Sequence, residues 1–161
     1  MKTNLLIASL VLAFQVVLHA QRLTPSERVI KTAVDNCMAK VTNEKADDGF
    51  SILFRDYWND KPTAPRAAMT MQREYREVLG RLEDRLGKAI PNGYEFIGVK
   101  RLGTCVIKLV YLQKNELSFL PWAFSFYRAA EDWRLTFISF PEVGGEDLKD
   151  FVVTNLANPM P

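Results

Sequence analysis

Histidine is nearly absent from this sequence. The one histidine is His19, close to the N-terminus, so the chain from Gln21 onward contains none. Histidine is the side chain that most often performs acid–base chemistry near neutral pH, and it is the commonest metal ligand. Its absence excludes Ser-His-Asp catalysis, Cys-His catalysis and any histidine metal site. No other catalytic motif stands out, so we predict no catalytic residue, no metal site and no cofactor.

Cysteine is scarce as well, since the sequence contains only Cys37 and Cys105 and no CxxC pair. A dithiol redox motif is therefore excluded. Cys37 lies on the apolar face of an expected helix, and Cys105 shares an expected strand face with Ile107. Two interpretations stay open. One is a disulfide between the two cysteines, which requires both side chains to point into the same layer. The other is a pair of buried thiols.

Neither sign of charge dominates, because 21 Lys and Arg residues stand against 19 Asp and Glu residues. Basic residues gather between positions 66 and 88, but Glu74, Glu77 and Glu83 are interleaved with them, as is typical of a solvated helix face. A chain with this balance offers no electrostatic surface for nucleic acid. We therefore expect no nucleic-acid partner.

Long hydrophobic runs are limited to residues 5–18, which follow the basic Lys2 and precede the small residue Ala20. This layout is typical of a secretory signal peptide that is cleaved after Ala20. A run of about fourteen mostly apolar residues is short for a bilayer span, although an uncleaved membrane anchor is the alternative. We expect an exported protein, periplasmic or secreted, without stable membrane insertion after cleavage.

The remaining chain has a length that suits one domain with one hydrophobic core. We assign residues 1–20 to the signal peptide, 21–155 to a single domain and 156–161 to a loose C-terminal tail. Within the domain, residues 146–155 have the composition of a last short helix.

Three amphipathic helices are expected first in the domain, because apolar residues recur there at helical spacing. Thr24 can cap the first helix, Asp47 begins the second, and Pro65 fits the start of the third. Gly87 is suited to end the third helix. The residues expected to be most buried in the whole domain are Leu53, Phe54, Trp58, Leu79, Leu82, Leu109 and Phe124.

Four β-rich runs follow the helices, at residues 94–101, 104–112, 117–127 and 133–140. Polar turns, one of them expected at residues 113–116, make these runs an antiparallel meander. Pro121 cannot donate to a strand ladder, so it indicates a bulge, a bend or an edge. The predicted fold class is α+β, with three N-terminal helices packed on a curved four-stranded antiparallel sheet.

The final hairpin carries a residue pattern, Trp122-Ala-Phe-Ser-Phe-Tyr127 and then Trp133-Arg-Leu135 after a polar turn. It resembles a Trp-x-Phe-x-Phe-Tyr … Trp-x-Leu pattern of uncharacterised exported members of the NTF2-like family, also called the cystatin-like α+β cone. The order of elements from residue 24 to 140 resembles that family as well. The resemblance implies a cone whose mouth often holds an apolar pocket and an outer sheet face that often forms a dimer.

Our main hypothesis is an exported, non-catalytic NTF2-like module that binds a small apolar ligand or a partner protein. Any one of its aromatic residues could instead simply fill the core. Lys108 interrupts an apolar strand, either as an anion anchor in the pocket or as a sheet-edge lysine that pairs with Glu95 or Glu116. The candidate ligand-binding residues are Tyr57, Tyr94, Lys108, Tyr111, Trp122, Phe124 and Trp133.

Two other classes of function are alternatives to this hypothesis. An enzyme of the ketosteroid isomerase or SnoaL-like kind needs a carboxylate base and an acidic donor in an apolar cavity. Glu95, Tyr94, Tyr111 and Tyr57 are candidates, but no spacing assigns their roles. A cystatin-type protease inhibitor is disfavoured, because the chain lacks the Gln-x-Val-x-Gly motif of cystatins.

Assembly is the last expectation from the sequence. Leu120, Trp122 and Phe124 alternate with Phe119 and Ala123, so neither face of the predicted third strand is polar. Monomeric proteins rarely leave large apolar patches in water. We therefore predict a two-fold homodimer through the uncovered sheet face. The alternative is that strong curvature wraps the sheet around the helices.

Overall fold

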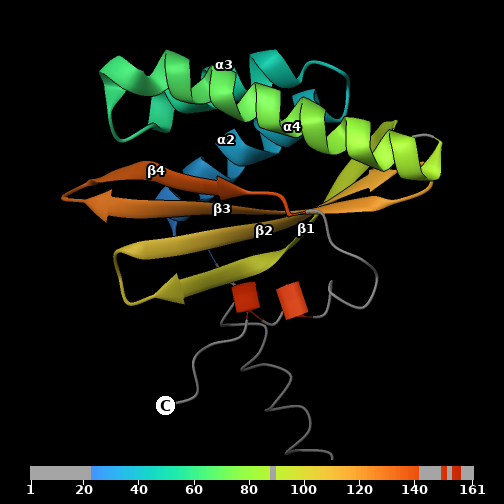
Figure 1. The fold of residues 1–161 in the computed structure, drawn as a ribbon. Coiled ribbons are helices and arrows are strands. Elements are labelled where there is room, and N and C mark those ends of the chain that lie inside the picture. The colour runs from blue at the N-terminus through green and yellow to red at the C-terminus, as the bar shows by residue number, and fades with distance from the viewer. Residues whose placement is uncertain (1–22, 88–89, 142–149, 152–153, 157–161) are drawn as a thin grey trace, which may run out of the picture.

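The computed structural model of this chain describes residues 23–87, 90–141, 150–151 and 154–156. In this part the protein is an α+β fold in which helices cover one face of a four-stranded antiparallel sheet (Figure 1). The expected fold class is confirmed at this level. The expected signal peptide, most of the expected last helix and nearly all of the expected tail lie outside the described residues. None of the described helices is long and apolar enough to cross a membrane.

Before the sheet come the helices α2 (Pro25–Val41), α3 (Ala46–Tyr57) and α4 (Ala64–Leu86), with a short 3-10 helix, η1 (Lys61–Thr63), ahead of α4. A capping box starts α2, because the Thr24 hydroxyl accepts from the Glu27 backbone and the Glu27 carboxylate accepts from the Thr24 backbone. Gly87 ends α4 with a φ of 78°, a left-handed conformation that suits glycine. Both helix ends agree with the expectation from the sequence.

The sheet consists of β1 (Pro91–Leu102), β2 (Val106–Asn115), β3 (Phe119–Ala129) and β4 (Asp132–Ser139), each antiparallel to the next. The turn expected at residues 113–116 is wrong, because β2 continues to Asn115 and Gln113 pairs with Leu120. The reason is tertiary. The Gln113 side chain is fully buried and accepts hydrogen bonds from Tyr75 and Trp122, which no local pattern reveals.

The ladders of the sheet are irregular at several points. Register shifts occur in β1, where Ile97 is an extra residue between Phe96 and Gly98, and in β4, where Thr136 is an extra residue opposite Ser125 and Phe126. Such bulges bend a strand and increase its twist, in line with the expected curvature. Pro121 pairs with β2 on one side and lies beyond the end of β4 on the other, so this part of β3 is an edge, where proline is tolerated.

The hydrophobic core lies between the helices and the sheet. Burial is confirmed for five of the expected core residues, namely Leu53, Phe54, Leu82, Leu109 and Phe124. Trp58 and Leu79 are only half-buried, so this part of the prediction is wrong. Trp58 has left α3 and forms an isolated parallel bridge with Leu135 of β4, which places its backbone beside the sheet edge.

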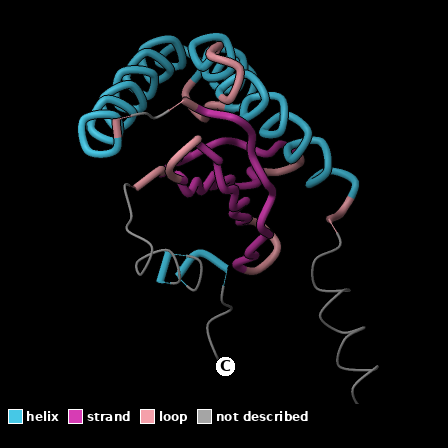
Figure 2. The backbone as a smooth tube through the Cα atoms, turned by 90° about the vertical axis from the view of Figure 1, so that its right-hand side faces the viewer, coloured by secondary structure: helices cyan, strands magenta, loops and turns pink. Residues whose placement is uncertain are grey.

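The face of the sheet away from the helices is partly covered by residues 150–151 and 154–156 (Figures 1 and 2). A Cβ atom on Gly98 would lie 3.3 Å from the Leu156 side chain, so the glycine allows this segment to approach β1 closely. Lys100 Nζ donates to the Thr154 carbonyl at 3.1 Å. The chain therefore covers part of its own outer sheet face.

The two cysteines are free thiols, so a disulfide between Cys37 and Cys105 is not formed. Cys37 is buried in α2, and burial raises its pKa to about 12. A Cβ on Gly49 of α3 would lie only 2.9 Å from the Cys37 carbonyl oxygen, which shows how closely the two helices approach. Cys105 is exposed in the turn between β1 and β2 and not on a strand face. The bridge fails because the two side chains belong to different parts of the fold.

Candidate ligand-binding cleft

A cleft of about 630 Å³ opens where three parts of the chain meet. The first two turns of α2 form one side, and the end of α3 together with η1 forms the second. The turn between β3 and β4 and the first residues of β4 form the third side. A cleft of this volume is in the range of small-molecule sites.

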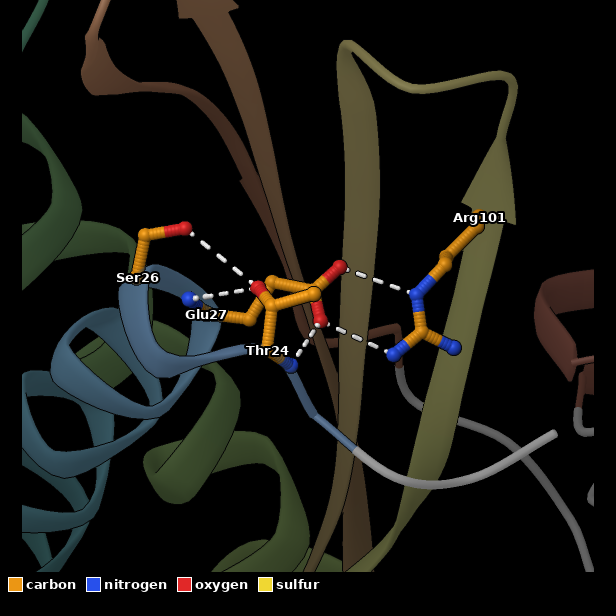
Figure 3. Close-up of polar contacts among 4 residues, drawn as sticks. All are labelled: Thr24, Ser26, Glu27 and Arg101. Atoms are coloured by element: carbon orange, nitrogen blue, oxygen red, sulfur yellow. Dashed lines mark hydrogen bonds and ion pairs between the residues drawn. The ribbon is translucent and has the colours of Figure 1, made fainter. Parts of the chain in front are cut away.

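The start of α2 is held in place by an ion pair with the sheet (Figure 3). Arg101 of β1 donates from Nε and Nη2 to the two carboxylate oxygens of Glu27, both at 2.9 Å. Burial alone would raise the pKa of Glu27, but the hydrogen bonds and charge of Arg101 and the hydrogen bonds from Thr24 outweigh it and lower that pKa. The pair joins α2 to β1, and this fixes the helix end that lines the cleft.

The apolar lining of the cleft comes from Val29 and Ile30 of α2 and from Tyr57 and Trp133. Val29 is 60% exposed, so its side chain is open to a ligand in the cleft, whereas Ile30 is buried. The Tyr57 ring lies edge-on to the buried Phe126 ring, with centroids 6.0 Å apart. Burial raises the pKa of Tyr57, and the charge of Asp56 acts in the same direction.

Trp133 is nine-tenths buried at the start of β4. The guanidinium carbon of Arg128 lies 5.5 Å from the centroid of its ring, in cation–π range. The Trp133 Nε1 atom is buried, and it has no hydrogen-bond partner among the described residues. A buried N–H group without a partner is uncommon in folded proteins.

The rim of the cleft carries charges of both signs. Asp56 pairs with Arg55 at 2.7 Å, and the hydrogen bond from Arg55 lowers the pKa of Asp56. Lys61 Nζ donates to the backbone carbonyls of Arg55 and Asp56, at 2.9 and 2.6 Å, so it caps the end of α3. The remaining charged side chains on the rim are Glu131, Asp132 and Arg134.

A second group of polar side chains lies between α2 and the strands β1 and β2. The Tyr111 hydroxyl donates to Asp35 Oδ1 at 2.8 Å, and Lys31 Nζ contacts both Asp35 oxygens, at 3.0 and 2.7 Å. The Lys31 ammonium also lies 4.6 Å from the centroid of the Phe96 ring. Burial, followed by the charge and hydrogen bond of Asp35, raises the pKa of Tyr111. Asp35 is therefore fully engaged by its neighbours.

The residues that the sequence predicted for one pocket lie in four different places. Tyr57 and Trp133 line the cleft. Tyr94 and Tyr111 are neighbours in the Asp35 group, with ring centroids 6.1 Å apart. The remaining three residues lie elsewhere: Trp122 and Phe124 are in the core, and Lys108 is on the opposite sheet face.

Lys108 has neither of the roles expected for it. Its Nζ donates to Asn155 Oδ1 at 2.9 Å, so it holds the C-terminal segment on the outer sheet face. Burial, followed by the charge of Lys100, lowers its pKa. Glu95, which was expected as a partner of Lys108 or as a catalytic base, is exposed and pairs with Lys114 at 2.9 Å.

Sequence reasoning missed Val29 and Ile30 as cleft residues and Asp35 as a hydrogen-bond partner of Tyr111. The sequence contained part of this information. Helical spacing places Val29 beside the buried face of α2, where an apolar side chain can be exposed. The approach of α2 to the end of α3 and to the β3–β4 turn is not visible in any local pattern.

Groups of His, Cys, Asp and Glu that could hold a metal ion are not found in the described part of the chain. Comparisons of the chain with models of known protein families, with curated proteins and with solved structures find no match. The function must therefore be inferred from the fold and from the cleft.

Proposed function

We propose that this chain is an exported, non-catalytic NTF2-like module that binds a small apolar ligand in the cleft between α2, α3 and the β3–β4 turn. The observation that carries the proposal is a cleft of about 630 Å³ with Val29, Tyr57 and Trp133 in its lining. Aromatic side chains with a few polar groups are the usual lining of small-molecule sites. The order of helices and strands supports the NTF2-like assignment, and residues 1–20 supply the expected export signal.

A small ligand is favoured over a protein partner at this place. Three elements line the cleft, and its apolar part consists of a few side chains, far fewer than a protein interface contains, which usually buries about 800 Å² on each partner. The alternative occupant is a partner protein. Native mass spectrometry distinguishes the two, because it gives the mass of the molecule that co-purifies with the protein.

Val29→Asp is expected to weaken binding of a neutral apolar dye, Nile red, by about tenfold, because it places a charge in the apolar lining. The substitution is suited to a folded variant, since Val29 is exposed. The measurement is a fluorescence titration of the purified mature protein. Met69→Asp is the matched control, because Met69 is exposed in a different apolar hollow between α3 and α4. Equal loss in both variants, or loss in Met69→Asp alone, would place the ligand elsewhere.

We also propose that two copies associate through the outer sheet face, at the half formed by β3 and β4. Residues 154–156 lie over the β1–β2 half, where Gly98 faces Leu156 and Lys108 contacts Asn155. On the other half, Phe137 is 60% exposed and Tyr127 is also exposed. Two such rings on one open face are a candidate for burial against a copy of themselves.

Phe137→Glu is expected to convert a micromolar dimer to a monomer, because it would bring two carboxylates together at the two-fold interface. Sedimentation equilibrium measures the mass directly. Leu117→Glu is the control, since Leu117 is equally exposed but lies in the turn between β2 and β3. A wild-type protein that is monomeric at this concentration would remove the dimer from the proposal.

An enzyme of the ketosteroid isomerase or SnoaL-like kind is the second candidate. It is favoured by the hydrogen bond between Tyr111 and Asp35, which brings a tyrosine and a carboxylate together beside aromatic rings. It ranks second because Lys31 neutralises Asp35 through both oxygens. Lys31 thus contacts both Asp35 oxygens and Tyr111 also donates to Oδ1, so a substrate would have to displace one of these groups.

A further inference from the structure

The three tryptophans of the chain differ in one respect that bears on the cleft. Trp58 Nε1 donates to Thr63 Oγ1 at 3.2 Å, and Trp122 Nε1 donates to Gln113 Oε1 at 3.2 Å. Trp133 Nε1 is buried and has no partner among the described residues. The side chain without a partner is also the one that lines the cleft.

An indole N–H group can only donate a hydrogen bond, so a partner for Trp133 must be an acceptor. Leaving such a donor buried and unpaired is unfavourable, and a structure that keeps one has a reason to do so. A ligand that brings an oxygen atom to Nε1 would recover the missing hydrogen bond and at the same time fill the cleft.

The charges around the cleft bear on whether the acceptor oxygen of the ligand is charged or neutral. Three carboxylates stand on the rim, at Asp56, Glu131 and Asp132, against two cations. One of these cations, Lys61, is already bound to backbone carbonyls. Asp56 is in turn paired with Arg55, and Arg128 lies over the Trp133 ring, so the charges around the cleft are close to balanced. A neutral carbonyl oxygen can accept the hydrogen bond there without a counter-charge.

We propose that the ligand of this cleft is a neutral carbonyl compound, such as a ketone, ester or amide, whose oxygen accepts the hydrogen bond of Trp133 Nε1 and whose apolar body lies against Val29 and Tyr57. This inference rests on the proposed function, because it assigns the ligand class of the same cleft. Since Nε1 is itself buried, binding includes a small shift of the side chains around Trp133. Arg128, which is half-buried and stacks on the Trp133 ring, is one side chain that can move.

Two probes of nearly the same shape test the proposal, acetophenone with a carbonyl group and ethylbenzene without one. In proton–nitrogen NMR spectra of the mature protein, each tryptophan gives one indole N–H signal. Acetophenone is expected to move the Trp133 signal downfield, and ethylbenzene is expected to bind without this shift. The Trp58 and Trp122 signals act as internal controls, because their N–H groups already have partners.

The matched variant is Trp133→Phe, which keeps an aromatic ring and removes the N–H group. It is expected to weaken acetophenone binding by about three- to tenfold, as the loss of one hydrogen bond predicts, and to change ethylbenzene binding less than about twofold. The wild-type NMR shift gives the answer independently if this variant does not fold.

The possible results separate the two proposals. If both probes bind with equal affinity and Trp133→Phe changes neither, the cleft binds apolar ligands but the carbonyl assignment is overturned. If a water molecule stays on the Trp133 N–H in the presence of both probes, as seen from a cross-peak between the indole proton and water, the assignment is likewise overturned. If neither probe binds, the proposed function of the cleft fails, and the carbonyl assignment fails with it.

Discussion

Replacing Trp122 by alanine is expected to lower the free energy of unfolding by about 3–5 kcal/mol, the range for removing a large aromatic side chain from a core. Trp122 is fully buried at the centre of an aromatic cluster. Its ring centroid lies 4.5 Å from that of Phe140, 5.4 Å from that of Tyr75 and 5.8 Å from that of Phe124. The change also removes a hydrogen bond to the buried Gln113, whose oxygen keeps only the bond from Tyr75.

Equilibrium unfolding in urea, followed by circular dichroism, measures this loss. Leu117→Ala is the control, because Leu117 is also a large apolar residue but is exposed in the turn between β2 and β3. Its substitution is expected to change the free energy of unfolding by less than about 0.5 kcal/mol. A loss below about 1 kcal/mol for Trp122→Ala would mean that the helices do not pack on this face of the sheet.

Arg101→Met is expected to destabilise the protein by about 2–4 kcal/mol at pH 7, because it leaves the buried Glu27 carboxylate without its cation. The expected loss is somewhat below that for a fully buried ion pair, since the Arg101 side chain is 28% exposed and water can partly replace it. The same change releases the start of α2 from β1, so it is also expected to weaken binding in the cleft.

The effect should depend on pH in a defined direction. The pKa of Glu27 is lowered in the folded protein, so the ion pair contributes its full stability above the ordinary pKa of glutamate. This contribution is lost as the pH falls through the lowered pKa of the folded state. The difference in unfolding free energy between wild type and Arg101→Met is therefore expected to be largest near pH 7 and to shrink in acid.

Arg73→Met is the matched control for this experiment, because Arg73 faces Glu77 at 3.8 Å in an exposed pair on α4. An exposed pair of this kind contributes little, so its loss should stay below about 0.5 kcal/mol with little dependence on pH. If Arg101→Met and Arg73→Met behave alike, the contact between α2 and β1 does not hold the fold together as described.

The parts of the fold that depend on neighbouring residues were predictable. Thr24, Pro25 and Glu27 contain the complete signal for a helix start, and the capping box they predict is formed. Gly87 ends α4 for an equally local reason, because a left-handed residue is needed there.

The parts that depend on distant residues were not predictable from local patterns. Gln113 looked like a turn residue, but the hydroxyl of Tyr75 and the indole of Trp122 make it a buried strand residue. Lys108 looked like a pocket residue, but its partner is Asn155, far along the chain. In both cases a polar side chain is satisfied by a group that the sequence does not place beside it.

The candidate site shows the same division. Tyr57 and Trp133 were expected as ligand-binding residues and do line the cleft, whereas Trp122 and Phe124 were expected there and lie in the core. Composition and spacing indicate that an aromatic residue is buried, but they do not tell whether a ligand or other side chains cover it.

The sequence by itself determined three things. The scarcity of histidine excluded several classes of chemistry, local signals set the ends of the helices, and the order of the apolar patterns gave the order of elements in an α+β fold. Each of these depends on residue types or on residues within about one helical turn of each other. The tertiary structure alone decided that α2, α3 and the β3–β4 turn line one cleft, that Arg101 holds Glu27, and that Trp133 Nε1 has no hydrogen-bond partner within the described part of the chain. These features depend on contacts between segments far apart in the chain, because only packing determines which buried polar groups find partners.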